Sequence, residues 1–192
     1  MSLFDCSCQR EASHSGDSSD GSSGNRGPGK QPSLASIVMN RRGERLALHS
    51  WPCPGGREEG VALLFHGYGV HAKFPSVGWF AETLCGAGLR CYCADMLGHG
   101  ESEGLSGLLP SVDGLIEDGL DVLAAVRSRH PCARIFLCGT SMGGAIALSV
   151  GLRVDFALAG VVLLSPMVRQ SAGNLPPPAV IAVLRALSYV LP

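Results

Sequence analysis

Short apolar runs of strand length alternate with amphipathic segments of helix length through most of this chain. The runs that predict strands cover 61–65, 90–96, 135–138 and 159–164, and the segments that predict helices cover 77–87, 112–129 and 142–152. Strands that are apolar throughout and alternate with helices form a parallel sheet with helices on both faces. The alternation therefore predicts an α/β fold with a mostly parallel sheet. Two short strands, 37–39 and 45–50, are expected before it, around a turn at Arg42-Gly43.

The spacing of apolar residues also has the helical period in two segments, and in the second it predicts the inward face. In the segment 77–87 the apolar set is Trp79, Phe80, Leu84 and Ala87. In the segment 112–129 the expected inward residues are Leu115, Ile116, Leu120, Leu123, Ala124 and Val126, and the expected outward residues are Glu117, Asp118, Asp121 and Arg127.

Composition divides the 192 residues into three parts. Residues 9–33 are dominated by Ser, Gly, Asp, Lys and Arg, and they cannot bury enough apolar surface to offset the entropy of ordering. We therefore expect a disordered leader over 1–33, a folded α/β core over 36–175 and the start of a helical cap over 176–192. The formal net charge of −1 argues against a nucleic-acid binder built on a basic face.

Eight cysteines are present, and no N-terminal basic region is followed by the apolar region of a secretory signal. We therefore expect reduced thiols and an intracellular protein, cytoplasmic or peripherally bound to a membrane. Cys91 and Cys93 lack the usual zinc-ligand spacing and would face the same side of a strand, so they are interpreted as packing residues. No metal or organic cofactor is expected. For Cys6 and Cys8, S-acylation and an unmodified, frayed terminus both remain open.

The segment GTSMG at 139–143 matches the G-x-S-x-G pattern of a nucleophile elbow. It follows the apolar strand 135–138 directly and runs into an apolar helix, which is the context that an elbow requires. Glycine two residues before and after the serine prevents a collision between strand and helix, and the helix presents its positive end to the serine. A second match around Ser102 has charged neighbours and no helix behind it. We therefore expect Ser141 to be the catalytic nucleophile.

Two further loops follow strands at the same edge of the predicted sheet. HGYG at 66–69 follows the strand 61–65, and backbone N–H groups from such a loop and from the residue after the nucleophile can stabilise an oxyanion. We expect these donors to be the N–H groups of Tyr68 and Met142. Residues expected to support the site are His66, Gly67, Gly139 and Gly143. His66 is expected to hydrogen-bond its own loop rather than to act as the general base.

The other loop, DMLGHGESEG at 95–104, contains Asp95, His99 and Ser102. These three residues are too close in sequence to indicate a catalytic triad, whose members are usually brought together by the fold. The loop is expected to form a hydrogen-bonded rim beside the site.

Together these segments resemble the monoacylglycerol lipase and lysophospholipase group of α/β-hydrolases, also called serine aminopeptidase-like hydrolases. The resemblance rests on HGYG, DMLGHGESEG and GTSMGGAIAL, with SVDGLIEDGLDVL at 111–123 and VVLLSPM at 161–167, and extends over about 37–192. It implies an α/β-hydrolase fold and hydrolysis of a monoacylglycerol or a similar single-chain lipid ester by Ser141. It also implies oxyanion donation by the Tyr68 and Met142 N–H groups.

The chain departs from this group after the nucleophile. The group takes its acid and its histidine from segments far downstream, but here Asp155 is the one Asp after Ser141, and no His follows His130. We therefore expect a fragment that lacks the general base and is inactive or nearly so. Two alternatives remain open: an acyltransferase or other esterase with the same serine, or a non-catalytic lipid-binding relative.

A helix is expected over 178–191, after three consecutive prolines at 176–178. Apolar residues cover most of its circumference, with Arg185 as the main polar point, so it requires burial on more than one side. We expect this helix to belong to the cap, to line the acyl-chain entrance and to contact a membrane.

Overall fold

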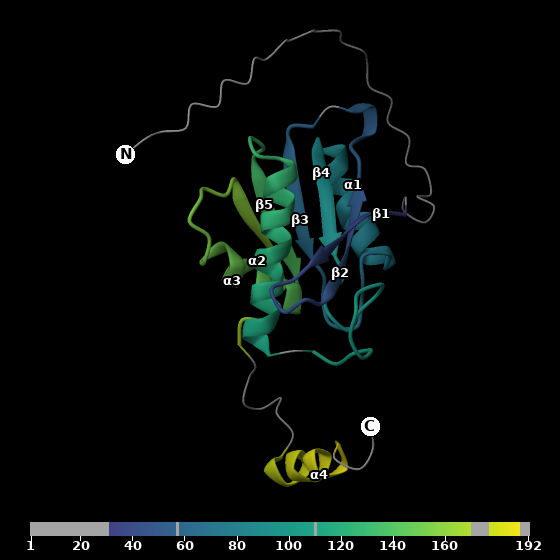
Figure 1. Cartoon of the computed structure of the whole chain (residues 1–192), viewed down its shortest axis with the longest axis vertical. Helices are drawn as coiled ribbons and strands as arrows, with labels where there is room; N and C mark the ends of the chain where they lie inside the picture. The colour runs from purple at the N-terminus through teal and green to yellow at the C-terminus, as the bar shows by residue number, and fades with distance from the viewer. Residues whose placement is uncertain (1–30, 57, 110, 170–176, 189–192) are drawn as a thin grey trace.

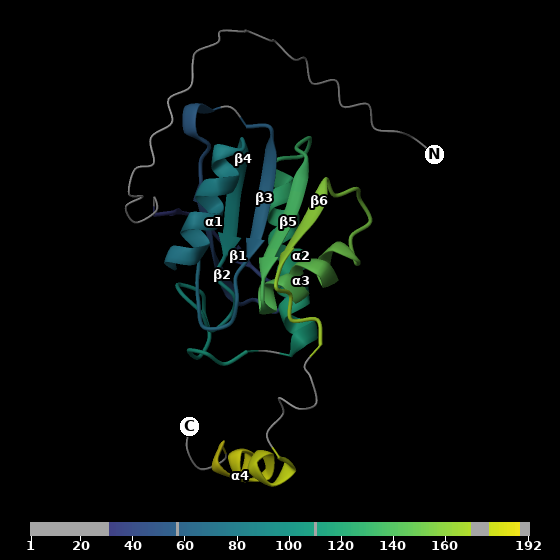
Figure 2. The ribbon, with the colours of Figure 1, turned by 180° about the vertical axis from the view of Figure 1, so that it is seen from behind.

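The computed structural model describes residues 31–56, 58–109, 111–169 and 177–188. Six strands form one sheet in the order β1-β2-β4-β3-β5-β6 (Figures 1 and 2). The strands are β1 Ser33–Met39, β2 Arg45–Trp51, β3 Gly60–Phe65, β4 Leu89–Ala94, β5 Ile135–Thr140 and β6 Gly160–Leu164. β4, β3, β5 and β6 are parallel, and the β1–β2 hairpin joins them antiparallel through β2. The predicted α/β fold with a mostly parallel sheet is confirmed.

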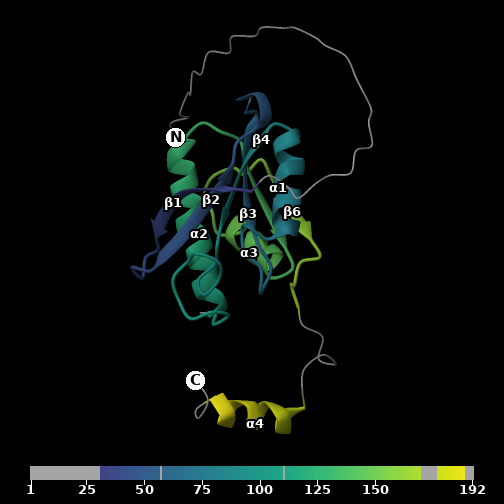
Figure 3. The ribbon, with the colours of Figure 1, turned by 90° about the vertical axis from the view of Figure 1, so that its right-hand side faces the viewer.

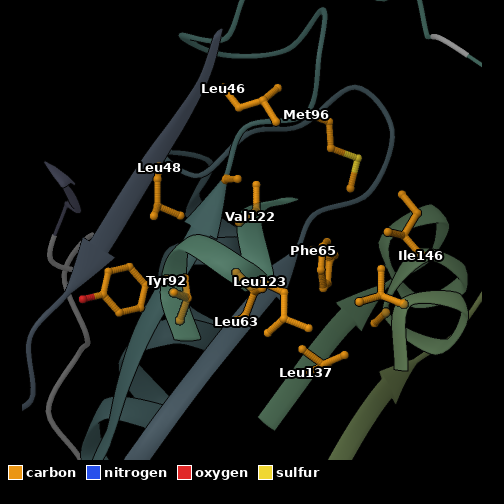
Figure 4. Packing of buried hydrophobic residues seen from close by; sticks show 14 of the residues in the cluster. Leu46, Leu48, Leu63, Phe65, Tyr92, Met96, Val122, Leu123, Leu137 and Ile146 are labelled. Carbon is orange, nitrogen blue, oxygen red and sulfur yellow. The ribbon is translucent and has the colours of Figure 1, made fainter. Parts of the chain in front are cut away.

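Helices cover both faces of this sheet. The helices are α1 Pro75–Gly86, α2 Val112–Arg129, α3 Met142–Gly151 and α4 Pro178–Ser188, with a short 3-10 turn at Pro54–Gly56. Figure 3 shows α1 and α2 on opposite sides of the strands. β3 supplies both sides, because Leu63 and Phe65 pack with α2 and α3, whereas Ala62 and Leu64 pack with α1. Figure 4 shows Leu63 and Phe65 among the side chains of the larger, α2–α3 cluster.

The predicted apolar set of α1 is only partly buried. Phe80 and Leu84 pack against the cluster beneath the helix, but Trp79 is 54% exposed. The buried positions are Val77, Gly78, Ala81 and Cys85, so the buried face includes small residues outside that apolar set.

On α2 the predicted length is confirmed, but two residue assignments are wrong. Ala124 is exposed, and Asp118 is buried. Asp118 is held by a hydrogen bond from Asn40 Nδ2 at 2.7 Å and by Arg42 Nη2 at 2.8 Å. Burial holds the pKa of Asp118 above its usual value despite these donors. The carboxylate therefore links α2 to the β1–β2 turn.

The cysteines of β4 pack as predicted. Cys91 and Cys93 are fully buried in the cluster beneath α1, with Cys85 and Cys138. The described residues contain no group of three or more side chains suited to a metal ion. Cys53, Cys85, Cys91, Cys93 and Cys138 are free thiols. Cys6 and Cys8 lie outside the described residues.

The two ends of the chain are only partly described. β1 begins at Ser33, three residues before the expected start of the core, and residues 1–30 of the predicted leader lie outside the described residues. At the other end, α4 lies apart from the α/β layers in all three views (Figures 1, 2 and 3). No helix in the described segments is long and apolar enough to span a bilayer.

Candidate active site

The sharpest backbone turn of the site lies between β5 and α3. Ser141 has φ 54° and ψ −119°, a conformation that a non-glycine residue adopts only when its surroundings impose it. Leu164 O, at the end of β6, accepts a hydrogen bond from Ser141 N at 3.0 Å. Ser141 O accepts hydrogen bonds from Gly144 N and Met167 N, each at 3.0 Å. Backbone hydrogen bonds thus hold the turn through both the N–H and the C=O of Ser141. The serine is exposed at the carboxyl end of the sheet.

Two glycines make this turn sterically allowed. A Cβ on Gly139 would lie 2.2 Å from Gly143 O, and a Cβ on Gly143 would lie 2.1 Å from Phe65 O. Both contacts are with backbone atoms, which cannot move without displacing α3 or β3. A side chain at either glycine would therefore distort the turn.

A hollow of about 400 Å³ opens beside Ser141. Its walls come from the ends of β3 and β6, from the loop after β3 and from the start of α1. Its lining is largely apolar, with Phe65, Val70, Val77, Phe80 and Leu164 among the residues that face it. An apolar hollow next to an exposed hydroxyl suits a ligand with a hydrocarbon chain.

The loop after β3 passes directly beside the elbow. A Cβ on Gly67 would lie 3.6 Å from the Ser141 Cβ, so the two backbones are neighbours. Met142 is the first residue of α3, and its N–H has no partner within that helix. Within the described part of the chain, neither this N–H nor that of Tyr68 donates to a backbone acceptor. Both predicted oxyanion donors are therefore free to bind a ligand atom.

His66 is a structural residue of this loop. Its Nε2 accepts a hydrogen bond from Met96 N at 2.9 Å, so the ring proton is on Nδ1, which donates to Gly67 O at 2.8 Å. Burial lowers the pKa of His66 from 6.5 to about 4. With its lone pair already used, the ring cannot accept the serine proton, in agreement with the predicted loop-binding role.

The loop 95–104 is held to the same region by His99 and Asp95. His99 Nε2 accepts from Gly69 N at 3.2 Å, and the Asp95 carboxylate accepts from Ala72 N at 2.7 Å. Ser102 Oγ donates to Asp95 O at 2.6 Å. The three residues therefore form the expected hydrogen-bonded rim and not a triad.

One buried partner in this network was not expected from the sequence. His49 on β2 is fully buried, and its Nε2 lies 3.0 Å from Asp95 Oδ2. A lone His in a strand carries no sequence signal for such a contact, because its partner lies 46 residues away. Burial alone would raise the pKa of Asp95. Hydrogen bonds from His49, Ala72 N and Glu101 N hold that pKa below its usual value.

The sheet order, the strand-turn-helix at Ser141 and the loop after β3 define an α/β hydrolase. The family described as serine aminopeptidase, S33, matches residues 56–192, and the chain belongs to this family. It is 30% identical over 156 residues to a monoglyceride lipase of Mus musculus, a match that covers 81% of this chain and 50% of that protein. It is 31% identical over 151 residues to a monoacylglycerol lipase of Mycolicibacterium smegmatis, covering 78% of this chain and 52% of the relative.

A solved structure shows the same arrangement. The monoacylglycerol lipase of Paleococcus ferrophilus superposes with a TM-score of 0.57 at 27% identity, over 77% of this chain and 52% of that one. The chain thus spans about half the length of the relatives that it matches.

Substitution of Gly143 by Ala tests the steric account of the elbow. Because the added methyl would meet Phe65 O at 2.1 Å, we expect a loss of at least about 3 kcal/mol in the free energy of unfolding, measured by urea denaturation. Gly78→Ala on α1 is the control, since no atom lies within 4 Å of its Cβ position, and should gain up to about 1 kcal/mol. Equal stability of the two variants would contradict the close backbone approach between Gly143 and Phe65.

Titration of His66 predicts a pH dependence of stability. The folded pKa of about 4 lies below the unfolded value near 6.5, so the unfolded chain binds more protons between these values. The contribution of His66 to the free energy of unfolding is complete above pH 6.5. It is lost as the pH falls toward 4, which lowers that free energy by up to about 3 kcal/mol. Urea unfolding from pH 7 to 4 should therefore show a steeper decline for the wild type than for His66→Asn. If the free energies of unfolding of the two proteins fell in parallel with pH, His66 would not have the lowered pKa.

Proposed function

We propose that this chain is the N-terminal part of a serine hydrolase of lipid esters, of the monoacylglycerol lipase or lysophospholipase kind, with Ser141 as nucleophile. The observation that carries the proposal is the strained turn at Ser141, which leaves the serine exposed at the end of the sheet beside an apolar hollow. The monoglyceride lipase relatives and the apolar hollow favour a lipid ester as the substrate.

In the proposed reaction, Ser141 Oγ attacks the ester carbonyl carbon while a general base takes the hydroxyl proton. The carbonyl oxygen becomes an oxyanion, which the N–H groups of Tyr68 and Met142 stabilise by hydrogen bonds. Collapse of this tetrahedral intermediate breaks the bond between the carbonyl carbon and the alcohol oxygen. The alcohol leaves with the proton, and the acyl group remains on Ser141 as an acyl-serine. Water then attacks the acyl-serine by the same steps and releases the fatty acid. These reaction steps require neither a metal nor an organic cofactor.

The geometry of α3 supports the oxyanion assignment. The helix begins at Met142, directly after the nucleophile, so its positive end faces the position where negative charge develops. The His66 and His99 hydrogen bonds hold the loop that presents Tyr68 N, which reduces the reorganisation needed in the transition state.

The general base is not among the described neighbours of the nucleophile. Within the described part of the chain, the Ser141 side chain is exposed and makes no capping hydrogen bond to α3. We assign the base and its acid to residues outside this part. This same observation favours the second candidate, a non-catalytic lipid-binding relative, and an activity assay separates the two.

α4 is proposed to form the start of the cap, at the acyl-chain entrance. Three of its apolar side chains, Val180, Val183 and Leu187, are between 44% and 58% exposed. An exposed apolar helix suits peripheral contact with a membrane, which we propose together with an intracellular location.

Active-site labelling tests the nucleophile. A fluorophosphonate probe should label Ser141 in the full-length protein, and Ser141→Ala should abolish both labelling and hydrolysis of a monoacylglycerol. Ser102→Ala, which removes the serine of the other matching motif, should leave labelling in place. Labelling that survives Ser141→Ala and disappears in Ser102→Ala would overturn the assignment. Labelling at Ser141 without turnover of any ester would favour the non-catalytic candidate.

Membrane contact by α4 is tested with the double variant Val183→Ser, Leu187→Ser. Each change removes apolar surface from the membrane contact, so binding to phosphatidylcholine liposomes should fall at least about tenfold. Ala186→Ser, an exposed residue of the same helix, is the matched control and should bind as the wild type does. Unchanged liposome binding by the double variant would exclude the membrane role of α4.

A further inference from the structure

The carboxylate of Asp95 joins the two loops beside Ser141 to β2. Asp95 directly follows β4, and its side chain is buried. One carboxylate oxygen, Oδ1, accepts a hydrogen bond from Ala72 N, in the loop after β3, at 2.7 Å. The other oxygen, Oδ2, accepts from Glu101 N at 2.9 Å and lies 3.0 Å from His49 Nε2. Three separate segments therefore meet at one carboxylate.

The surroundings of the His49 ring determine which of its nitrogens carries the proton. Two carboxylate oxygens lie near Nε2, because Glu101 Oε2 is 3.7 Å away in addition to Asp95 Oδ2. An ionised carboxylate can only accept hydrogen bonds, so Nε2 must be the protonated nitrogen that donates to Asp95. Nδ1 has no hydrogen-bond partner in the described part of the chain. A second proton there would be a buried donor without an acceptor, so we assign the neutral Nε2–H tautomer.

The unpartnered nitrogen shows that His49 is not the most stable choice for its position on β2. The side chain is fully buried, and a buried polar atom without a hydrogen bond costs about 1–3 kcal/mol. An apolar side chain of similar size would avoid this cost. What the imidazole supplies is a neutral N–H donor to Asp95. The role of His49 therefore lies in what Asp95 holds in place.

The loop that begins at Asp95 contacts the residues on both sides of Tyr68. A backbone N–H of this loop donates to His66 Nε2 at 2.9 Å, and His99 Nε2 accepts from Gly69 N at 3.2 Å. Tyr68 lies between these two contacts. The direction of the Tyr68 N–H thus depends on the position of the loop that the Asp95 carboxylate folds.

We propose that His49 is a positioning residue: by donating to Asp95 it fixes the loop after β3, so that the Tyr68 N–H points at the oxyanion that forms at Ser141. This inference rests on the proposed function. Without the Nε2–H donor, Asp95 Oδ2 loses one of these two partners, and the carboxylate can rotate away from Ala72 N. A displaced N–H stabilises the transition state less, while the hollow still binds the hydrocarbon chain. Loss of the donor should therefore lower kcat and leave KM unchanged.

Two amide substitutions in the full-length protein separate the donor from the ring. Gln places its amide nitrogen near the position of the imidazole Nε2, whereas the shorter Asn places it near Nδ1, out of reach of Asp95. His49→Asn should lower kcat for a monoacylglycerol at least about tenfold, with KM within about twofold of the wild type. His49→Gln should restore kcat to within about threefold of the wild type, because it keeps a neutral donor to the carboxylate.

Asp118→Asn is the matched control for a loss of stability. It also changes a buried, hydrogen-bonded side chain, but Asp118 binds Asn40 and Arg42, in the turn between β1 and β2. This variant should lower the free energy of unfolding and keep the kcat of the wild type, at a temperature where all variants are folded. An equal loss of kcat in Asp118→Asn and His49→Asn would show a global effect and would overturn the positioning role.

Hydrogen exchange gives a second measurement at the loop itself. Peptides that cover residues 66–74 should exchange faster in His49→Asn than in the wild type, and His49→Gln should match the wild type. If the wild type hydrolyses the ester and His49→Asn changes neither kcat nor this exchange, the inference is wrong and the proposed function stands. Absence of ester turnover in the wild type would instead overturn the proposed function, together with the inference that rests on it.

Discussion

The close crossing of β5 and α3 over the end of β3 is the contact on which the rest of the structure depends. At Gly143 the helix backbone meets the carbonyl oxygens of Phe65 and His66 so closely that a single methyl group would not fit. This contact places the first turn of α3 against the loop after β3, and it forces Ser141 into its positive-φ conformation. The position of the hydroxyl, of the Met142 N–H and of the adjoining loop all follow from one backbone approach.

Buried polar side chains then hold the two surface loops to this crossing. His66 binds Met96 N, His99 binds Gly69 N, and Asp95 binds Ala72 N, so each loop is tied to the other. His49 lies beneath Asp95 and extends this network to β2. Hydrogen bonds of this kind, satisfied inside the protein, keep a catalytic loop in one conformation.

Membership of the serine aminopeptidase S33 family and similarity to monoacylglycerol lipases give the site a chemical context. The chain spans about half the length of these relatives. Its described part holds the strained serine turn and an adjoining apolar hollow, on which the proposed ester hydrolysis rests.

The sequence by itself determined the element order, the parallel sheet and the turn at Ser141, because apolar periodicity and glycine spacing are local properties of the chain. It also indicated that His66 is structural. It did not determine that Trp79 of α1 is exposed while Ala81 and Cys85 are buried, because that depends on how the helix lies on the sheet. Nor did it place Asp118 inside or join His49 to Asp95, because each contact pairs residues far apart in the chain. Only the tertiary structure decides such pairs, since the partner that compensates the burial of a polar group is brought to it by the fold.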